Sequence, residues 1–185
     1  MKLYHGSNMD ISVPDLSKSK PYKDFGQGFY LSADKNQATE MAKQKTVLMR
    51  FGTPCVSVFE FNESLMLSSE LKVKIFNEYS VEWAQFILEN RDMKRQHPIH
   101  DYDIVYGPIA DDGVTFQLRR HLSGAITIEE LVKELHYAKG ITFQYWLYLN
   151  LQNYETYRRT NKNDARGYVC GTDTNPNGKV WIFFR

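Results

Sequence analysis

Three side chains able to bind or transform a ligand lie far apart in the sequence. His5 belongs to a short run near the start of the chain, Tyr30 follows two closely spaced glycines, and Gln144 stands near the start of an aromatic run. An imidazole and an amide offer hydrogen bonds, and a phenol ring offers a stacking surface. If the fold brings them together, these groups predict a pocket for a flat, polar ligand.

The two glycines lie in the segment Asp24-Phe25-Gly26-Gln27-Gly28-Phe29-Tyr30-Leu31-Ser32. Glycine lets the backbone turn tightly, or approach a ligand where a Cβ atom would clash. The sequence leaves both explanations open for Gly26 and Gly28. In either case the turn delivers Tyr30 on the strand that follows.

Several other chemistries lack their motifs. The chain has no Gly-x-Ser-x-Gly elbow, no Gly-x-x-x-x-Gly-Lys-Ser/Thr loop, and no third glycine after Gly26 and Gly28. A serine hydrolase, a P-loop nucleotide site and a Rossmann site are therefore not indicated. His97 and His100 could be metal ligands, but no third ligand lies near them, and a solvated loop is the preferred interpretation.

The composition is that of an ordinary globular domain. The chain has 185 residues, of which 42% are hydrophobic and 24% charged, and its formal net charge is +1. This balance gives no indication of nucleic-acid binding. Two cysteines in no metal-like spacing favour reduced thiols. Without an apolar leader or a long apolar run, the sequence predicts a soluble, cytoplasmic protein with no membrane partner.

The hydrophobic pattern predicts a mixture of strands and helices without regular alternation, which favours an α+β fold. The predicted strands cover residues 2–5, 29–32, 56–61, 141–151 and 180–184, with another from 102 that ends in an acidic turn at 111–113. The predicted helices begin at 34, 68, 80 and 127. Residues 173–178 indicate the turn of a C-terminal hairpin.

Two capping boxes mark helix starts. Asp34 with Gln37, and Thr127 with Glu130, have the spacing at which the two side chains cap a helix reciprocally. We expect one domain over residues 1–185, with 152–185 as a tail that forms the hairpin.

The order of three motifs carries a resemblance. They are Leu3-Tyr4-His5-Gly6-Ser7, the glycine segment 24–32, and Tyr102-Asp103-Ile104-Val105-x-Gly107-Pro108-x-Ala110-Asp111-Asp112. Over roughly residues 1–151 the chain resembles a bacterial family of domains of unknown function. That family is similar to the ADP-ribosyltransferase superfamily, in its branch of diphtheria-toxin-like and poly-ADP-ribose-polymerase-like enzymes.

The resemblance implies a split, two-sheet β core with helices around an NAD cleft, and it implies roles for single residues. His5 would hydrogen-bond a ribose hydroxyl, backbone groups of Gly6 would hold the nicotinamide amide beside Ser7, and Tyr30 would stack on the nicotinamide ring. Further NAD-binding positions would be Tyr4, Phe25, Gly26, Gly28, Leu31 and Asp111. Taken singly, His5 is better explained as a structural strand residue and Tyr30 as a core residue.

The third catalytic position departs from the superfamily, which usually has a glutamate on a later strand. The corresponding strand here offers Gln144, whose neutral amide can orient a ribose but carries no charge. Asp111, Asp112 or Glu155 could supply the charge instead. Gln144 could also simply make a hydrogen bond at the start of its strand.

The resemblance implies transfer of a single ADP-ribose from NAD to a macromolecular acceptor, protein or nucleic acid. Such an enzyme would suit a bacterial or phage toxin or defence system, with an antitoxin or regulatory partner. NAD hydrolysis and NAD binding without turnover are the alternatives.

Overall fold

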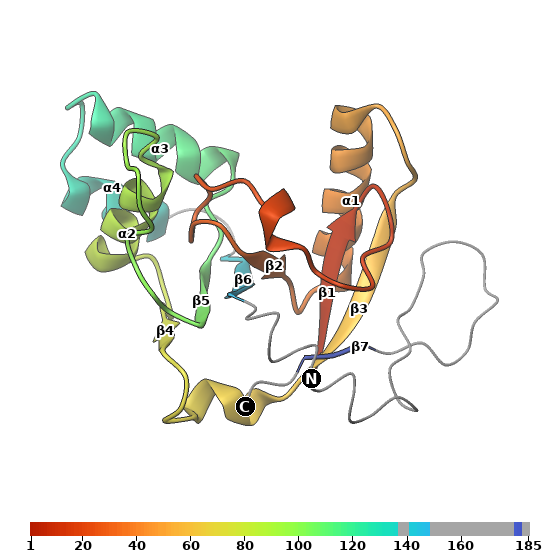
Figure 1. Ribbon diagram of the computed structural model, residues 1–185. Helices are drawn as coiled ribbons and strands as arrows, with labels where there is room; N and C mark the ends of the chain where they lie inside the picture. The colour runs from red at the N-terminus through yellow and green to blue at the C-terminus, as the bar shows by residue number, and fades with distance from the viewer. Residues whose placement is uncertain (137–140, 149–179, 183–185) are drawn as a thin grey trace. The chain divides into compact units, whose positions relative to one another are not determined.

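A computed structural model describes residues 1–136, 141–148 and 180–182. Its strands are β1 (Lys2–Ser7), β2 (Phe29–Leu31), β3 (Cys55–Phe61), β4 (Val73–Ile75), β5 (Ile104–Pro108), β6 (Phe143–Leu147) and β7 (Val180–Ile182). Its α-helices are α1 (Lys35–Met49), α2 (Val81–Arg91), α3 (Asp112–Leu122) and α4 (Ile128–His136), with 3₁₀ turns at Leu16–Lys18 and Glu63–Leu67 (Figure 1). Two sheets and four α-helices in the described residues confirm the α+β class.

The chain forms two compact units from interleaved segments. The first comprises Met1–Asp15, Phe29–Leu71 and, within 149–185, the described strand β7; the second comprises Leu16–Gly28 and Lys72–Tyr148. The chain therefore passes from the first unit to the second and back again at the glycine segment. Each unit is described by itself below.

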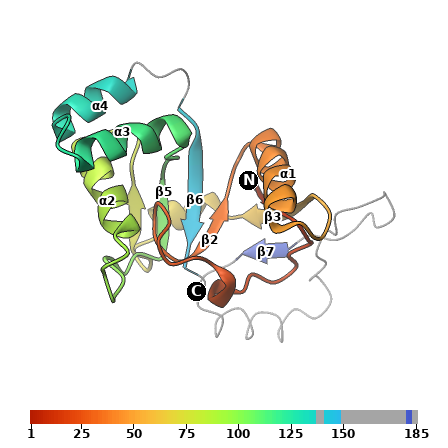
Figure 2. The ribbon, with the colours of Figure 1, turned by 90° about the horizontal axis from the view of Figure 1, so that it is seen from above.

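The first unit is a sheet with the order β1-β3-β7 and helix α1 beside it (Figures 1 and 2). β1 runs antiparallel to β3, from Lys2 opposite Glu60 to Ser7 opposite Cys55, and β7 pairs parallel with β3. Every second residue of β3 is buried, as expected for a strand with one face on the core. The core includes Leu3, Phe29, Leu31, Ala38, Ala42, Phe59 and Phe61.

Contact between α1 and β1 depends on the absence of a side chain at Gly6. A Cβ atom there would lie 2.0 Å from the backbone oxygen of Ala38 and 2.8 Å from the backbone nitrogen of Ala42. Both alanines are buried, so small residues on the helix meet a glycine on the strand. The packing of the helix thus explains this glycine.

In the second unit β5 lies between β4, which is parallel to it, and β6, which is antiparallel. Figure 2 shows α2, α3 and α4 together on one side of these strands. The indole of Trp83 on α2 is fully buried and donates to the carbonyl oxygen of Pro108 at 3.1 Å, which ties α2 to the end of β5. Leu131 and Leu135 form the buried stripe of α4.

The predicted helix from residue 68 is wrong. Leu71, Ile75 and Tyr79 have helical spacing, but residues 73–75 form strand β4 beside residues 104–106. Ile75 is 42% exposed, so the spacing did not mark a buried helical face. Backbone pairing with β5 outweighs the local pattern here. The next helix begins as predicted, with Ser80 as its N-cap.

The acidic turn after β5 is also corrected. Asp111 is the N-cap of α3, because its side chain accepts a hydrogen bond from the backbone N–H of Val114 at 2.9 Å. Asp-Gly is a common turn signal, but here the dipeptide Asp112-Gly113 lies in the first turn of a helix.

The second capping box is confirmed, and the first is modified. The N–H of Thr127 donates to Glu130 at 2.8 Å, and the N–H of Glu130 donates to the Thr127 hydroxyl at 3.1 Å. At α1, Asp34 caps through the N–H of Asn36, while Gln37 contacts the Ser32 hydroxyl.

The predicted strand near the C-terminus is confirmed over Val180–Ile182. The turn and the first strand of the predicted hairpin lie outside the described residues, as does Glu155.

We predict that Gly6→Ala lowers the free energy of unfolding by about 3 kcal/mol, because backbone atoms of α1 cannot yield to the new methyl group. Chemical denaturation measures the change. Gly113→Ala is the matched control, since its Cβ would make only an ordinary contact at 3.4 Å. Equal stability of the two variants would contradict this account of Gly6.

Candidate functional site

His5 and Tyr30 lie side by side in the first unit. The Nδ1 atom of His5 is 2.7 Å from the carbonyl oxygen of Tyr30. The register is fixed by an antiparallel bridge in which Tyr4 and Ser32 exchange both backbone hydrogen bonds, at 2.8 and 2.9 Å. The His5 ring also stacks on Phe29, with centroids 4.5 Å apart. Two segments 25 residues apart thus hold the imidazole in one orientation.

This contact assigns the tautomer of His5. A carbonyl oxygen can only accept a hydrogen bond, so Nδ1 must carry the proton and donate it. In the neutral ring Nε2 is then the acceptor. An acceptor nitrogen on a fixed ring suits a ligand hydroxyl group.

The other predicted positions of the first unit differ in exposure. Tyr4 and Tyr30 are half-buried, whereas Ser7 and Leu31 are buried, with 1% and 2% of their surface exposed. The Ser7 hydroxyl donates to the side chain of Asn8 at 3.5 Å. Ser7 and Leu31 therefore belong to the interior that supports the half-buried tyrosines.

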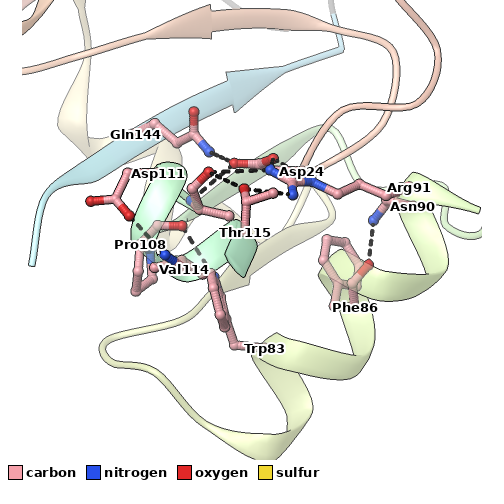
Figure 3. A network of polar contacts seen from close by, with 11 residues as sticks. Asp24, Trp83, Phe86, Asn90, Arg91, Pro108, Asp111, Val114, Thr115 and Gln144 are labelled. Carbon is pink, nitrogen blue, oxygen red and sulfur yellow. Dashed lines mark hydrogen bonds and ion pairs between the residues drawn. The ribbon is translucent and has the colours of Figure 1, made fainter. Parts of the chain in front are cut away.

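The second unit contains a polar network centred on Asp24 (Figure 3). One carboxylate oxygen accepts from Nε and Nη2 of Arg91, at 3.0 and 2.6 Å. The other accepts from the backbone N–H of Ala110 and from Nε2 of Gln144, both at 3.1 Å. Arg91 also donates to the Thr115 hydroxyl and to the Ala110 carbonyl oxygen, at 3.1 and 3.2 Å.

Gln144 thereby gains a fixed place near the start of β6. The residue is 9% exposed, and its pairing with Gly107 places it opposite the second half of β5. The charge of Asp24 is compensated by Arg91, so the network brings no uncompensated negative charge to this position.

The structure gives the glycines of segment 24–32 a role in turning and packing. Gly26 has φ = +79°, a conformation that favours glycine, and its N–H donates to the carbonyl oxygen of Lys23 at 3.0 Å. A Cβ atom at Gly28 would lie 2.0 Å from Nε1 of Trp146. Phe25 is fully buried among the aromatic rings of the second unit, so its ring supports this turn from inside.

His100 is half-buried, although sequence patterns predicted a solvated loop. Its ring stacks on Phe86 at 4.9 Å, its Nε2 lies 3.1 Å from the carbonyl oxygen of Phe25, and its Nδ1 accepts from the N–H of Tyr102 at 3.3 Å. Burial lowers the pKa of His100, and the contact with Phe25 and the charge of Asp101 oppose this in part. The neutral ring thus satisfies both neighbours.

The predicted residues are distributed over both units. The first unit brings together Tyr4, His5, Gly6, Ser7, Tyr30 and Leu31, and the second contains Phe25, Gly26, Gly28, Asp111 and Gln144. Asp111 is exposed and serves α3 as its N-cap. In the described part of the chain no cluster of three His, Cys, Asp or Glu side chains could hold a metal ion, and no helix is long and apolar enough to span a membrane.

Sequence reasoning missed the two charged residues at the centre of the network. Asp24 and Arg91 are separated by 67 residues, and no local pattern links them. The only signal for Asp24 was its position directly before the glycine turn.

The structure is an α+β fold in which the neighbouring strands β1 and β2 bring His5 into contact with Tyr30. The family model described as "Protein of unknown function (DUF3990)" matches residues 1–152, and the chain belongs to this family. These residues are nearly the same as the range, roughly 1–151, over which the sequence resembles a family of unknown function. Neither the curated proteins nor the solved structures contain a significant match.

We predict that the protein loses stability as the pH falls below about 6.5, the ordinary pKa of histidine. Because His100 has a lower pKa in the folded state than in the unfolded state, the unfolded state binds the proton first, and acid favours unfolding. Chemical denaturation between pH 5 and pH 8 measures this loss. His100→Gln should flatten the profile, whereas His97→Gln, in the exposed loop, should keep it. A flat wild-type profile would contradict the prediction.

Proposed function

We propose that the protein is a mono-ADP-ribosyltransferase that transfers ADP-ribose from NAD to a macromolecular acceptor. The observation that carries the proposal is the contact between His5 and the Tyr30 backbone, in a chain whose motifs resemble that superfamily. The donor set suits NAD, since an imidazole acceptor can take a ribose hydroxyl and a half-buried phenol ring can stack on nicotinamide.

In the proposed reaction the bond between nicotinamide and C1′ of the ribose breaks, and its electron pair leaves with nicotinamide. Positive charge develops on the ribose, as in other glycosyl transfers. A nucleophilic group of the acceptor then bonds to C1′ and releases its proton. The residues contribute by holding the ring and the ribose in a reactive orientation.

His5 would accept a hydrogen bond from a ribose hydroxyl through Nε2, because its Nδ1 proton is donated to Tyr30. Tyr30 would stack on the nicotinamide ring. Gln144 would orient the ribose as a neutral hydrogen-bonding group. Because Gln144 lacks the charge of a glutamate, we expect a single transfer rather than chain elongation.

A second candidate is an NAD-binding protein without turnover. The observation that favours it is the neutral amide at 144, together with the compensation of Asp24 by Arg91. Such a protein would be stabilised by NAD, since a ligand that binds only the folded state raises its stability.

We predict that the purified protein consumes labelled NAD and places the label on a macromolecule from a lysate of bacterial cells. Free ADP-ribose alone would indicate hydrolysis. Thermal stabilisation by NAD without any product would indicate the binding protein. Neither product nor stabilisation would contradict an NAD site altogether.

We further predict that His5→Ala and Tyr30→Ala each lower NAD turnover at least about a hundredfold while the protein stays folded, because each removes a contact to the reacting nucleoside. His97→Ala and Tyr22→Ala are matched controls in exposed positions. Circular dichroism checks the fold. A folded His5→Ala variant with wild-type turnover would remove His5 from the site.

A further inference from the structure

We infer that Asp24 is a positioning residue that fixes the orientation of the Gln144 amide, so that the oxygen of that amide is the atom offered to a ligand. The inference deepens the proposed function and rests on it, because the ligand group concerned is a ribose hydroxyl. It also explains how a glutamine can serve where the superfamily usually has an acid.

The first step is the direction of the contact between the two side chains. A carboxylate has no hydrogen to donate, so the group of Gln144 that faces Asp24 at 3.1 Å must be its NH₂. The two ends of an amide point in opposite directions. Figure 3 shows the Gln144 oxygen directed away from Asp24, and the amide cannot turn over without losing its hydrogen bond.

The second step is that Asp24 itself cannot rotate. Its four hydrogen bonds come from three separate places: two from Arg91 on α2, one from the backbone N–H of Ala110 between β5 and α3, and one from Gln144 on β6. Its side chain is only 13% exposed. A buried charge that lost these donors would pay a large desolvation cost.

The third step concerns Arg91, which holds the carboxylate from the opposite side. Its two remaining contacts are to the Thr115 hydroxyl and the Ala110 carbonyl oxygen. These contacts help to hold the guanidinium in place against the carboxylate.

The last step is chemical. An amide that donates to a carboxylate is polarised, and its oxygen becomes a stronger acceptor. A ribose hydroxyl needs such an acceptor, and a neutral amide beside a paired carboxylate supplies it. A glutamate at position 144 would instead face Asp24 with a like charge, which disfavours both ionised forms. In this arrangement the acid, Asp24, contacts Gln144, and Gln144 is the group that contacts the ligand.

The test exchanges the two groups. In Asp24→Asn the new amide would keep its oxygen toward Arg91 and turn its NH₂ toward Gln144, so the hydrogen bond from the Ala110 N–H is lost. The Gln144 amide would then turn over and offer its NH₂ to the ligand. Turnover of NAD should fall about 10- to 100-fold in kcat, the effect of one unmade hydrogen bond in the reacting complex. Gln144→Glu alone should lower the melting temperature because two carboxylates meet.

The double variant Asp24→Asn with Gln144→Glu restores a donor–acceptor pair and offers a carboxylate oxygen to the ligand. We expect its kcat to recover to within about threefold of the wild-type value. Its melting temperature should exceed the value expected from adding the two single changes. Thr127→Ala is the matched control: it removes the N-cap of α4, which has no contact with the network, so it should lower the melting temperature and leave kcat unchanged.

The outcomes separate the inference from the proposed function. Wild-type protein that neither binds nor consumes NAD overturns the proposed function, while the melting temperatures of the four variants still decide whether residues 24 and 144 are coupled. Active wild type with unchanged kcat in Asp24→Asn overturns the inference. Strictly additive melting temperatures, or a kcat loss in Thr127→Ala as large as in Asp24→Asn, overturn it as well.

Discussion

The second unit depends on the burial of one carboxylate. Asp24 precedes a tight turn, and its two oxygens accept four hydrogen bonds from α2, from the junction of β5 and α3, and from β6. A buried charge is tolerated only when such donors compensate for lost water. The requirement to satisfy Asp24 therefore links Arg91, Ala110 and Gln144 within this unit.

Close backbone contact is the corresponding constraint in the first unit. α1 packs directly on Gly6, the neighbour of His5 on β1, and the His5 ring reaches the Tyr30 carbonyl oxygen. Glycine serves a similar purpose at position 28, where the indole of Trp146 covers the backbone. Packing thus accounts for each of these glycines within its own unit. Gly6 and Gly28 therefore belong to the sequence motifs and are also required by the packing of the fold.

The sequence predicted the elements whose signals are local. Strands β1 and β3, the N-cap Ser80 and the reciprocal cap of Thr127 with Glu130 follow from alternation and side-chain chemistry within a few residues. Pairs of distant segments could not be predicted. β4 exists because of its pairing with β5, and the half-buried position of His100 depends on the ring of Phe86.

The candidate site shows the same division. The resemblance implied one site for His5 and Tyr30, and the structure shows His5 Nδ1 in contact with the backbone oxygen of Tyr30. The contact between Gln144 and Asp24 was not predicted, because the two residues are 120 positions apart and no local sequence pattern links them. Whether a glutamine acts as donor or acceptor depends on that partner, so its chemical role could be inferred only from coordinates.

A crystal structure with a non-hydrolysable NAD analogue tests the central claim most directly. We expect the nicotinamide ring on Tyr30 and a ribose hydroxyl within about 3 Å of His5 Nε2. A nucleotide bound away from His5 and Tyr30, or crystals that never take up the analogue at saturating concentration, would contradict it.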